Sequence, residues 1–250
     1  MLKKNVILTF TIGTLILSVI LNFFLFKKFK TAYIKEQTTL IEPIHSSKNI
    51  YNTNDSLKNT ESILLIGDSR IAQWSPKPDF NSEVINYGMS GETTIQLFYR
   101  IKKEIDSYKS NIIIIQTGVN DLKTIGLFPD KKDEIIAHCF TNIENIASML
   151  SQKGKNIIIL TIFPHGKISL IRKPIWDDSV KEAISEVNNQ LRNISIPGVS
   201  VIDCDSILSL DNNLLNPSYS ADELHLNVSG YKKLNSYLKP IVNNYIKTNN

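Results

Sequence analysis

Five short apolar runs constrain the fold of this chain more than any other feature of its sequence. Each is the length of one β-strand and is rich in β-branched residues, as in the Ile-Ile-Ile-Ile of residues 112–115. Such continuous hydrophobicity is typical of strands that are buried on both faces, as in a parallel sheet covered by helices. We therefore expect a buried sheet built from residues 63–66, 84–87, 112–115, 157–162 and 199–202.

The longer stretches between and after these runs have the spacing of amphipathic helices. Within residues 131–152, for example, apolar side chains recur at Ile135, Cys139 and Ile143, one helical turn apart. The alternation predicts an α/β fold, a three-layer α/β/α sandwich with a five-stranded parallel sheet and right-handed crossovers. The other expected helices cover residues 93–108, 178–194 and 228–246.

The amino-terminal segment differs from the rest of the chain. Residues 6–26 carry no charge, and as a helix they would span roughly 30 Å of hydrocarbon. A cleaved signal peptide would have a shorter apolar core and a small-x-small exit, and a buried core helix would need a polar stripe. We therefore expect an uncleaved single-pass membrane anchor over residues 1–30, a polar tether over 31–61 and one globular domain over 62–250.

The lysines around this segment leave its orientation open. Lys3 and Lys4 precede the apolar run, and Lys27, Lys28 and Lys30 follow it, so the positive charges nearly balance. Because amino-terminal anchors commonly leave their short end inside, we expect the globular domain outside the cytoplasm, periplasmic or extracellular, although the three following lysines favour the opposite orientation.

The charge of the remaining chain argues against nucleic acid as a partner. Five of the 28 basic residues lie in the first thirty positions, and the other 23 face 24 acidic residues, which leaves no basic excess for a phosphate backbone. Cys139 and Cys204 match neither a metal-ligand spacing nor a redox pair. Two buried thiols are the simpler interpretation, with a disulfide as the alternative. No metal or cofactor is expected.

Polar or glycine-containing turns follow the first three apolar runs. Residues 67–70 read Gly-Asp-Ser-Arg, residues 86–91 read Asn-Tyr-Gly-Met-Ser-Gly, and residues 118–121 read Gly-Val-Asn-Asp. Each alone is an ordinary turn or helix cap. Together they supply a hydroxyl, a backbone N–H and a side-chain amide at the carboxyl edge of the sheet, where functional groups gather. This combination suits acyl transfer.

An acid and a histidine stand close together near the carboxyl terminus. Residues 222–227 read Asp-Glu-Leu-His-Leu-Asn, so Asp222 precedes His225 by three positions and can reach its Nδ1 within one loop. A histidine before a helix is often an exposed capping residue. Here, however, it follows an acid in a chain that already carries a candidate nucleophile, Ser69, for which it would serve as the base.

These four segments resemble, in content and order, the sequence blocks of the SGNH hydrolases, also called GDSL-like lipases and esterases, from about Ser62 to Ile246. The resemblance implies a flavodoxin-like SGNH hydrolase fold. It implies a catalytic Ser69, His225 and Asp222, and an oxyanion hole formed by the N–H groups of Ser69 and Gly88 and the side chain of Asn120.

Arg70 stands where the family name has leucine, next to the expected nucleophile. A cation at this position could alter which acyl or leaving group is accepted. The simpler interpretation is a side chain that faces solvent or a nearby acid.

Several neighbouring residues have two interpretations. Asp68 and Asp121 flank expected catalytic positions and more simply stabilise the turns through Asx-type hydrogen bonds. An acyl pocket or plain loop packing would each explain the side chains of Trp74, Met89, Phe163 and His165.

The sequence thus predicts a serine ester hydrolase that forms an acyl-enzyme. Its expected substrate is a small-molecule, lipid or glycan ester, such as a lysophospholipid or an acetylated carbohydrate, and its expected membrane contact is the amino-terminal helix. An O-acyltransferase with the same site and a non-catalytic binding module of the same fold are the alternatives. The sequence leaves the oligomeric state open.

Overall fold

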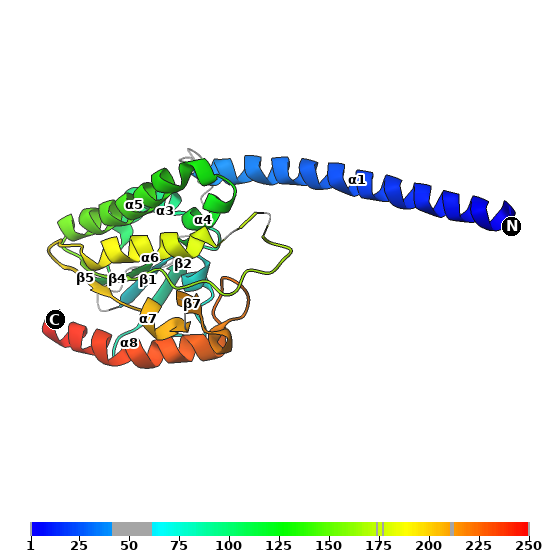
Figure 1. Cartoon of the computed structure of the whole chain (residues 1–250). Helices are drawn as coiled ribbons and strands as arrows, with labels where there is room; N and C mark the ends of the chain where they lie inside the picture. The colour runs from blue at the N-terminus through cyan, green and yellow to red at the C-terminus, as the bar shows by residue number, and fades with distance from the viewer. Residues whose placement is uncertain (1, 42–61, 174, 177, 211–212, 250) are drawn as a thin grey trace. The chain divides into compact units, whose positions relative to one another are not determined.

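The computed structural model describes residues 2–41, 62–173, 175–176, 178–210 and 213–249. The chain divides into two compact units, Met1–Thr39 and Leu40–Asn250, and each is described by itself. Figure 1 shows the first as a single helix and the second as a layered α/β unit.

One long helix, α1 (Leu2–Ile41), forms the first unit. Its stretch Asn5–Lys35 is long and apolar enough for a membrane anchor or a signal sequence. Residues 31–41, expected to begin the polar tether, instead continue the helix, because no proline or glycine interrupts the chain between Gly13 and Pro43. The rest of the expected tether, residues 42–61, lies outside the described residues.

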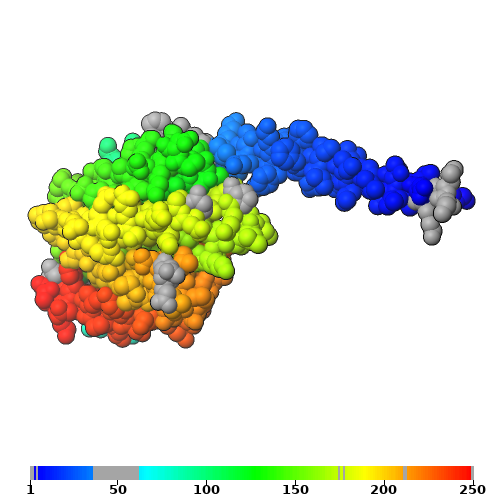
Figure 2. Space-filling view, viewed as in Figure 1, coloured from blue at the N-terminus to red at the C-terminus, as the bar shows by residue number. Residues whose placement is uncertain are grey.

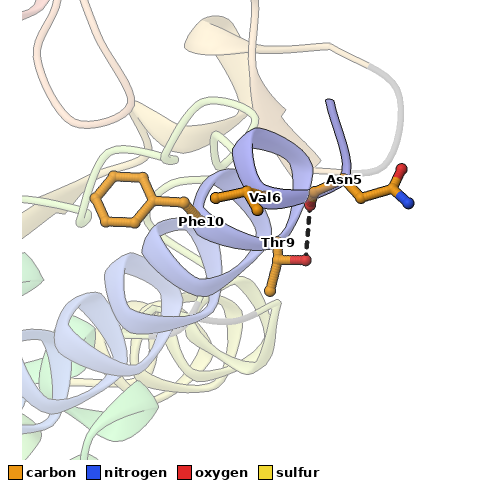
Figure 3. A pocket seen from close by; sticks show the side chains of 4 residues that line it. All are labelled: Asn5, Val6, Thr9 and Phe10. Atoms are coloured by element: carbon orange, nitrogen blue, oxygen red, sulfur yellow. Dashed lines mark hydrogen bonds between the residues drawn. The ribbon is translucent and has the colours of Figure 1, made fainter. Parts of the chain in front are cut away.

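Polar side chains within α1 bond to the helix itself. Asn5, Val6, Thr9 and Phe10 line a shallow hollow on one side of this helix (Figure 3), where the Thr9 hydroxyl donates to the Asn5 carbonyl at 2.9 Å. A hydroxyl satisfied in this way costs little in an apolar surrounding. The hollow lies on the surface of α1 and carries none of the chemistry expected from the sequence.

The second unit contains the predicted five-stranded parallel sheet, with strand order β2-β1-β3-β4-β5. Chain order and spatial order diverge at β1, which lies between β2 and β3, and this switch point is where ligands bind in open α/β sheets. The strands are β1 (Ile63–Gly67), β2 (Val84–Gly88), β3 (Ile112–Gln116), β4 (Asn156–Leu160) and β5 (Val199–Ile202).

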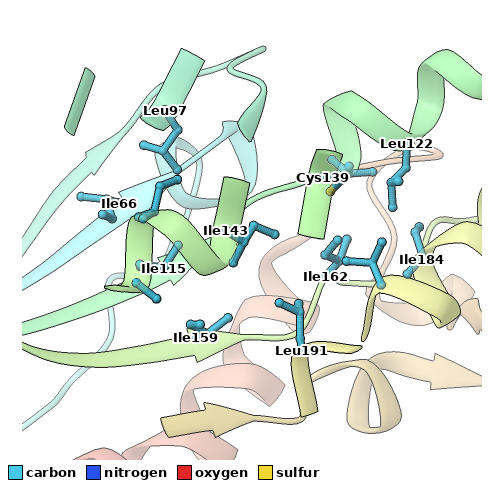
Figure 4. Close-up of a cluster of buried hydrophobic side chains, with 14 of the residues drawn as sticks. Ile66, Leu97, Ile115, Leu122, Cys139, Ile143, Ile159, Ile162, Ile184 and Leu191 are labelled. Atoms are coloured by element: carbon cyan, nitrogen blue, oxygen red, sulfur yellow. The ribbon is translucent and has the colours of Figure 1, made fainter. Parts of the chain in front are cut away.

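Alternate residues of each central strand enter two separate cores. In β1, Leu64 and Ile66 face one cluster, while Ile63 and Leu65 face the other, as the two-residue period of a strand requires. The first cluster packs under α3, α5 and α6 (Figure 4), and the second packs under α8 on the opposite face (Figure 1). This burial on both faces explains the continuous hydrophobicity of the runs and confirms the three-layer prediction.

The helices agree closely with the sequence pattern. Four long helices are α3 (Thr94–Glu104), α5 (Lys132–Gln152), α6 (Ser179–Arg192) and α8 (Val228–Asn249). Short elements near the strand ends are α2 (Ser69–Ala72), α4 (Val119–Leu122), α7 (Asp205–Leu208), β6 (Ser209–Leu210), β7 (Leu214–Leu215), and the 3-10 turns η2 (Ile105–Ser107), η3 (Lys123–Gly126), η4 (Pro129–Lys131) and η6 (Pro217–Tyr219).

Both cysteines are free thiols. Cys139 belongs to the first core cluster and Cys204 to the second, so the sheet separates them. The interpretation as two buried apolar side chains is therefore confirmed over a disulfide.

Candidate active site

Ser69 lies directly after β1, at the carboxyl edge of the sheet. It is the first residue of α2, and the Asp68 side chain caps that helix by accepting the Arg70 N–H at 2.9 Å. In register with Gly67 are Gly88 of β2 and Gln116 of β3, so the turns after all three strands reach the same edge. This is the convergence that the sequence pattern predicts.

His225 and Asp222 lie in the loop before α8, and the structure brings them to Ser69. The Nε2 atom of His225 is 2.9 Å from Ser69 Oγ, and its Nδ1 atom is 2.8 Å from Asp222 Oδ2. Because a carboxylate only accepts, Nδ1 carries the proton and the Nε2 lone pair faces the serine hydroxyl. The side chains have the geometry required of nucleophile, base and orienting acid.

The Asp222 carboxylate is fixed by several donors. Its Oδ1 atom accepts the backbone N–H groups of Leu224 at 2.7 Å and His225 at 2.8 Å. Partial burial alone would raise the pKa of Asp222, but the hydrogen bonds from the His225 ring and these two amides outweigh it and hold the pKa below its usual range. Asp222 is therefore suited to stabilise a protonated His225.

The Asn120 amide has a fixed orientation beside this site. Its Nδ2 atom donates to the Glu92 carbonyl at 3.0 Å, and its Oδ1 atom accepts from Lys123 Nζ at 2.8 Å. Glu92 itself is held by a buried two-pronged ion pair with Arg100, with two N–O distances of 2.7 Å. Within the part of the chain that the structure describes, one hydrogen of the Asn120 amide has no acceptor and is available to a ligand.

Gly88 differs from the sequence-based expectation. Its N–H donates to the Asn86 side chain at 3.0 Å, so it is not the free donor that was expected. A Cβ atom here would lie 2.3 Å from the backbone nitrogen of Ala72, so close packing of β2 against α2 requires a glycine. The glycine at position 88 is thus explained by packing, which the motif alone does not reveal.

Gly91, three residues later, has the free backbone donor. Among the described residues, no group accepts its N–H or that of Ser69. Its φ of +82° favours glycine, and nothing lies within 4 Å of a Cβ built there. Gly91 also precedes Glu92, whose carbonyl binds the Asn120 amide. The sequence signal that could have found it is the second glycine of the Asn-Tyr-Gly-Met-Ser-Gly turn after β2.

Arg70 is the second difference, because its side chain points into the protein rather than to solvent or an acid. It is fully buried and donates to the carbonyls of Leu224 at 3.0 Å, Phe163 at 2.7 Å and Pro164 at 3.2 Å. Burial lowers the pKa of Arg70. The guanidinium joins the loop after β4 to the loop that carries His225.

Asp68 stabilises its own turn, as expected, whereas Asp121 bonds to Thr94 at the start of α3. Besides the contact of Asp68 with Arg70, Asp121 accepts the Thr94 N–H at 2.9 Å and the Thr94 hydroxyl at 2.6 Å. Burial raises the pKa of Asp121 to about 6, although the hydrogen bonds from Thr94 oppose the shift. Burial also raises the pKa of Asp68, whose Oδ2 atom has no partner among the described residues.

Three of the four residues considered for an acyl pocket are packed into the interior. Trp74, Phe163 and His165 are exposed by 5%, 0% and 1%, which supports loop packing over pocket lining, while Met89 is half-buried. Among the described residues, no group of three histidine, cysteine or acidic side chains is arranged to hold a metal ion.

Comparison with known proteins links this geometry to one enzyme family. Residues 66–233 match the GDSL-like Lipase/Acylhydrolase family. The match includes the segments that carry Ser69, Asn120, Asp222 and His225.

Solved structures share the fold at low sequence identity. A GDSL-like lipase from Bacteroides thetaiotaomicron is 16% identical with a TM-score of 0.58, over 86% of this chain and 98% of that one. The lipase/acylhydrolase from Enterococcus faecalis is 19% identical with a TM-score of 0.53, over 74% and 96%. An acetylxylan esterase from Geobacillus stearothermophilus is 18% identical with a TM-score of 0.50, over 72% and 94%.

A curated relative is named as a transferase, unlike the hydrolases above, and its chain is longer. The N-acylneuraminate cytidylyltransferase of Escherichia coli O18:K1:H7 (strain RS218 / NMEC) is 26% identical over 220 residues, which cover 86% of this chain and 49% of the relative. The chain thus spans about half the length of the curated relative it matches.

Proposed function

The chain belongs to the GDSL-like lipase/acylhydrolase family, and from this premise we propose that it is a serine carboxylic ester hydrolase that uses Ser69, His225 and Asp222. One observation carries the proposal: the Ser69 hydroxyl lies 2.9 Å from His225 Nε2, while Nδ1 of the same ring lies 2.8 Å from the Asp222 carboxylate. A non-catalytic binding module would not need this contact.

The reaction begins when His225 Nε2 takes the Ser69 proton as Oγ attacks the ester carbonyl. Asp222 stabilises the imidazolium that forms. Collapse of the tetrahedral intermediate breaks the ester C–O bond, and His225 returns its proton to the departing alcohol. Water then attacks the acyl-enzyme by the same route, and the carboxylic acid leaves with Ser69 restored.

The negative charge on the tetrahedral oxygen needs donors at the strand ends. We assign this role to the backbone N–H groups of Ser69 and Gly91 and to the Asn120 side chain. Gly91 replaces Gly88 because the Gly88 N–H is already bound to Asn86. Removing one such donor typically lowers kcat by about 10²–10³.

The substrate class follows from the site and from the names of similar proteins. The burial of Trp74, Phe163 and His165 argues against a deep acyl channel formed by these side chains and favours a short acyl group. One similar structure is an acetylxylan esterase, and the curated relative is named for an N-acylneuraminate. We therefore place acetylated carbohydrates first, with lysophospholipids as the second class.

We also infer that α1 remains attached as a single-pass anchor, with the globular unit outside the cytoplasm. Its length and apolar composition support a membrane segment, and the absence of a small-x-small exit in the Phe-Phe-Leu-Phe end of the apolar run argues against cleavage. This location brings the site close to lipids and cell-envelope glycans.

The decisive experiment compares hydrolysis of p-nitrophenyl acetate by the full chain and by Ser69→Ala. We expect kcat to fall at least about 10³-fold, because the alanine variant has no nucleophile. A serine-directed fluorophosphonate should label wild type at Ser69 and leave the variant unlabelled. Ser236→Ala, an exposed serine on α8, is the matched control and should keep wild-type turnover.

Equal turnover in wild type and Ser69→Ala would contradict the proposal. A series of longer acyl esters, acetylated xylo-oligosaccharides and lysophospholipids then orders the substrate classes. Added acceptor alcohols that yield transfer products in preference to free acid would assign the site to an O-acyltransferase instead.

A further inference from the structure

Two adjacent aliphatic side chains stand exposed at the tip of the long loop between β4 and α6. Leu170 is 83% exposed and Ile171 is 90% exposed. The other large apolar side chains exposed on the described part of the globular unit are isolated, and none exceeds 56%. Single exposed apolar residues are ordinary on protein surfaces, so an adjacent and nearly fully exposed pair is the feature that needs an explanation.

The tip is an ordered turn on a fixed base. The N–H groups of Arg172 and Lys173 both donate to the Ser169 carbonyl, at 3.0 Å and 3.2 Å. On either side, Ile168 and Trp176 are buried to 5% and 4% exposure within the first core cluster. Figure 1 shows the segment leaving the sheet as a long yellow-green loop, and Figure 2 shows the same colour at the rim of the globular unit.

Basic side chains flank the apolar pair. Lys167, Arg172 and Lys173 are all exposed, and the sequence from 165 to 176 contains no acid. Arg172 pairs with Glu223, with 3.5 Å between Nε and Oε2. Two other described acids lie near the base of the loop: Asp222, which bonds to His225, and Asp178, which acts electrostatically on His165. Lys167 and Lys173 remain as positive charges beside Leu170 and Ile171.

The loop also contacts the segment that carries the candidate base. The Gly166 N–H donates to the Glu223 carbonyl at 2.8 Å, two residues before His225. Whatever binds the tip is therefore held beside the active site.

We propose that this tip docks into the surface of a bilayer that contains anionic lipids, as a second membrane contact besides α1. Leu170 and Ile171 would enter the acyl boundary while the lysines face anionic headgroups, the arrangement that holds interfacial segments on membranes. Two residues are too small a patch for a stable protein interface. The proposed anchor α1, which is long and apolar enough to cross a membrane, would raise the local concentration of lipid at the tip.

The test attaches an environment-sensitive fluorophore to Leu170→Cys in the full chain. Cys139 and Cys204 are fully buried, so the introduced thiol is the one that reacts. The labelled chain is reconstituted into phosphatidylcholine vesicles with and without 30 mol % (roughly one lipid in three) phosphatidylglycerol. Ser236→Cys, on the exposed side of α8, carries the same probe as the matched control.

We expect a blue-shifted emission and at least about twofold quenching by nitroxide-bearing lipid at position 170 in anionic vesicles, and neither at position 236. Lys167→Gln together with Lys173→Gln should remove at least about half of the shift. These readouts do not depend on ester hydrolysis, so they remain informative if the proposed function fails.

Three outcomes would overturn the inference. The first is an emission at position 170 that is not blue-shifted in either vesicle type, as at position 236. Equal shifts in both vesicle types would remove the requirement for anionic lipid. A shift in phosphatidylcholine vesicles that appears only after a soluble ester is added would assign the tip to substrate binding instead.

Discussion

The Asn120 amide serves the proposed oxyanion hole only if its nitrogen, and not its oxygen, faces the substrate. Two neighbours fix this orientation. Lys123 Nζ can only donate, and it bonds to Oδ1 at 2.8 Å. The Glu92 carbonyl can only accept, and it bonds to Nδ2 at 3.0 Å. Burial lowers the pKa of Lys123, although the charges of Asp68 and Asp121 oppose this shift. Lys123 is thus a positioning residue for Asn120.

Replacing this lysine should slow the reaction without weakening substrate binding. For Lys123→Met we expect kcat to fall roughly tenfold and KM to change less than about twofold, since a hydrogen bond that fixes a transition-state donor is lost. Kinetics of Lys123→Met, Asn120→Ala and the double variant measure the coupling.

In that cycle the double variant should be no slower than Asn120→Ala alone, because Lys123 acts through Asn120. Lys131→Met, an exposed lysine on η4, is the control and should leave kcat unchanged. Independent, multiplicative effects of the two substitutions would contradict the positioning role.

The sequence predicts the site unevenly at the scale of single residues. The positions of Ser69 and Asn120 follow from strand ends and those of His225 and Asp222 from one local spacing, because these relations are short in sequence. Two features depend on three-dimensional packing and could not be read from spacing: the capture of the Gly88 N–H by Asn86, and the burial of Arg70 against carbonyls more than ninety positions away.

At the scale of elements, Asp121 of α4 connects that helix to the first turn of α3. It accepts both the N–H and the hydroxyl of Thr94, and its surroundings raise its pKa to about 6, mainly through burial. A raised pKa means that the folded state binds this proton more tightly than the unfolded chain. The contribution of the group to stability is therefore full below about pH 4 and is lost as the pH rises through 6.

The variant Asp121→Asn should expose this dependence, because it cannot titrate. From pH 4 to 7 we expect the free energy of unfolding of wild type to fall by up to about 3 kcal/mol relative to the variant. Urea unfolding followed by the fluorescence of Trp74 and Trp176, both buried, measures it. A difference between the two proteins that stays constant across this range would show that Asp121 titrates normally.

The elements themselves were predicted more closely than their ends. All five strands and four long helices lie where the apolar patterns indicate. Strands buried on both faces leave a continuous apolar run, and helices buried on one face leave a helical period. The helix α1 continues through residues 31–41, where a polar tether was expected, since polar residues there remain compatible with a helix when no breaker is present.

At the scale of the whole molecule, the globular unit contains its own core. Among the described residues, every member of both buried clusters lies between Ile63 and Ile246. Stability of the globular unit should therefore not depend on the amino-terminal helix.

Removal of residues 1–61 tests this independence. We expect the truncated chain to be monodisperse without detergent and to melt within about 2 °C of the globular transition of the full chain, because it keeps every core residue that the structure describes. Differential scanning calorimetry measures both transitions. Aggregation, or a transition lower by about 10 °C, would mean that the amino-terminal residues complete the fold.

The buried guanidinium of Arg70 also limits which parts can be exchanged between this chain and its relatives. Its three hydrogen bonds reach two loops, one after β4 and one before α8. A relative with leucine at this position must satisfy the corresponding carbonyls by other means. A chimera that takes either loop from such a relative without the matching residue at position 70 would leave buried carbonyls, or the buried charge of Arg70, without a hydrogen-bond partner. The segment around residue 70 and these two loops must therefore be exchanged together.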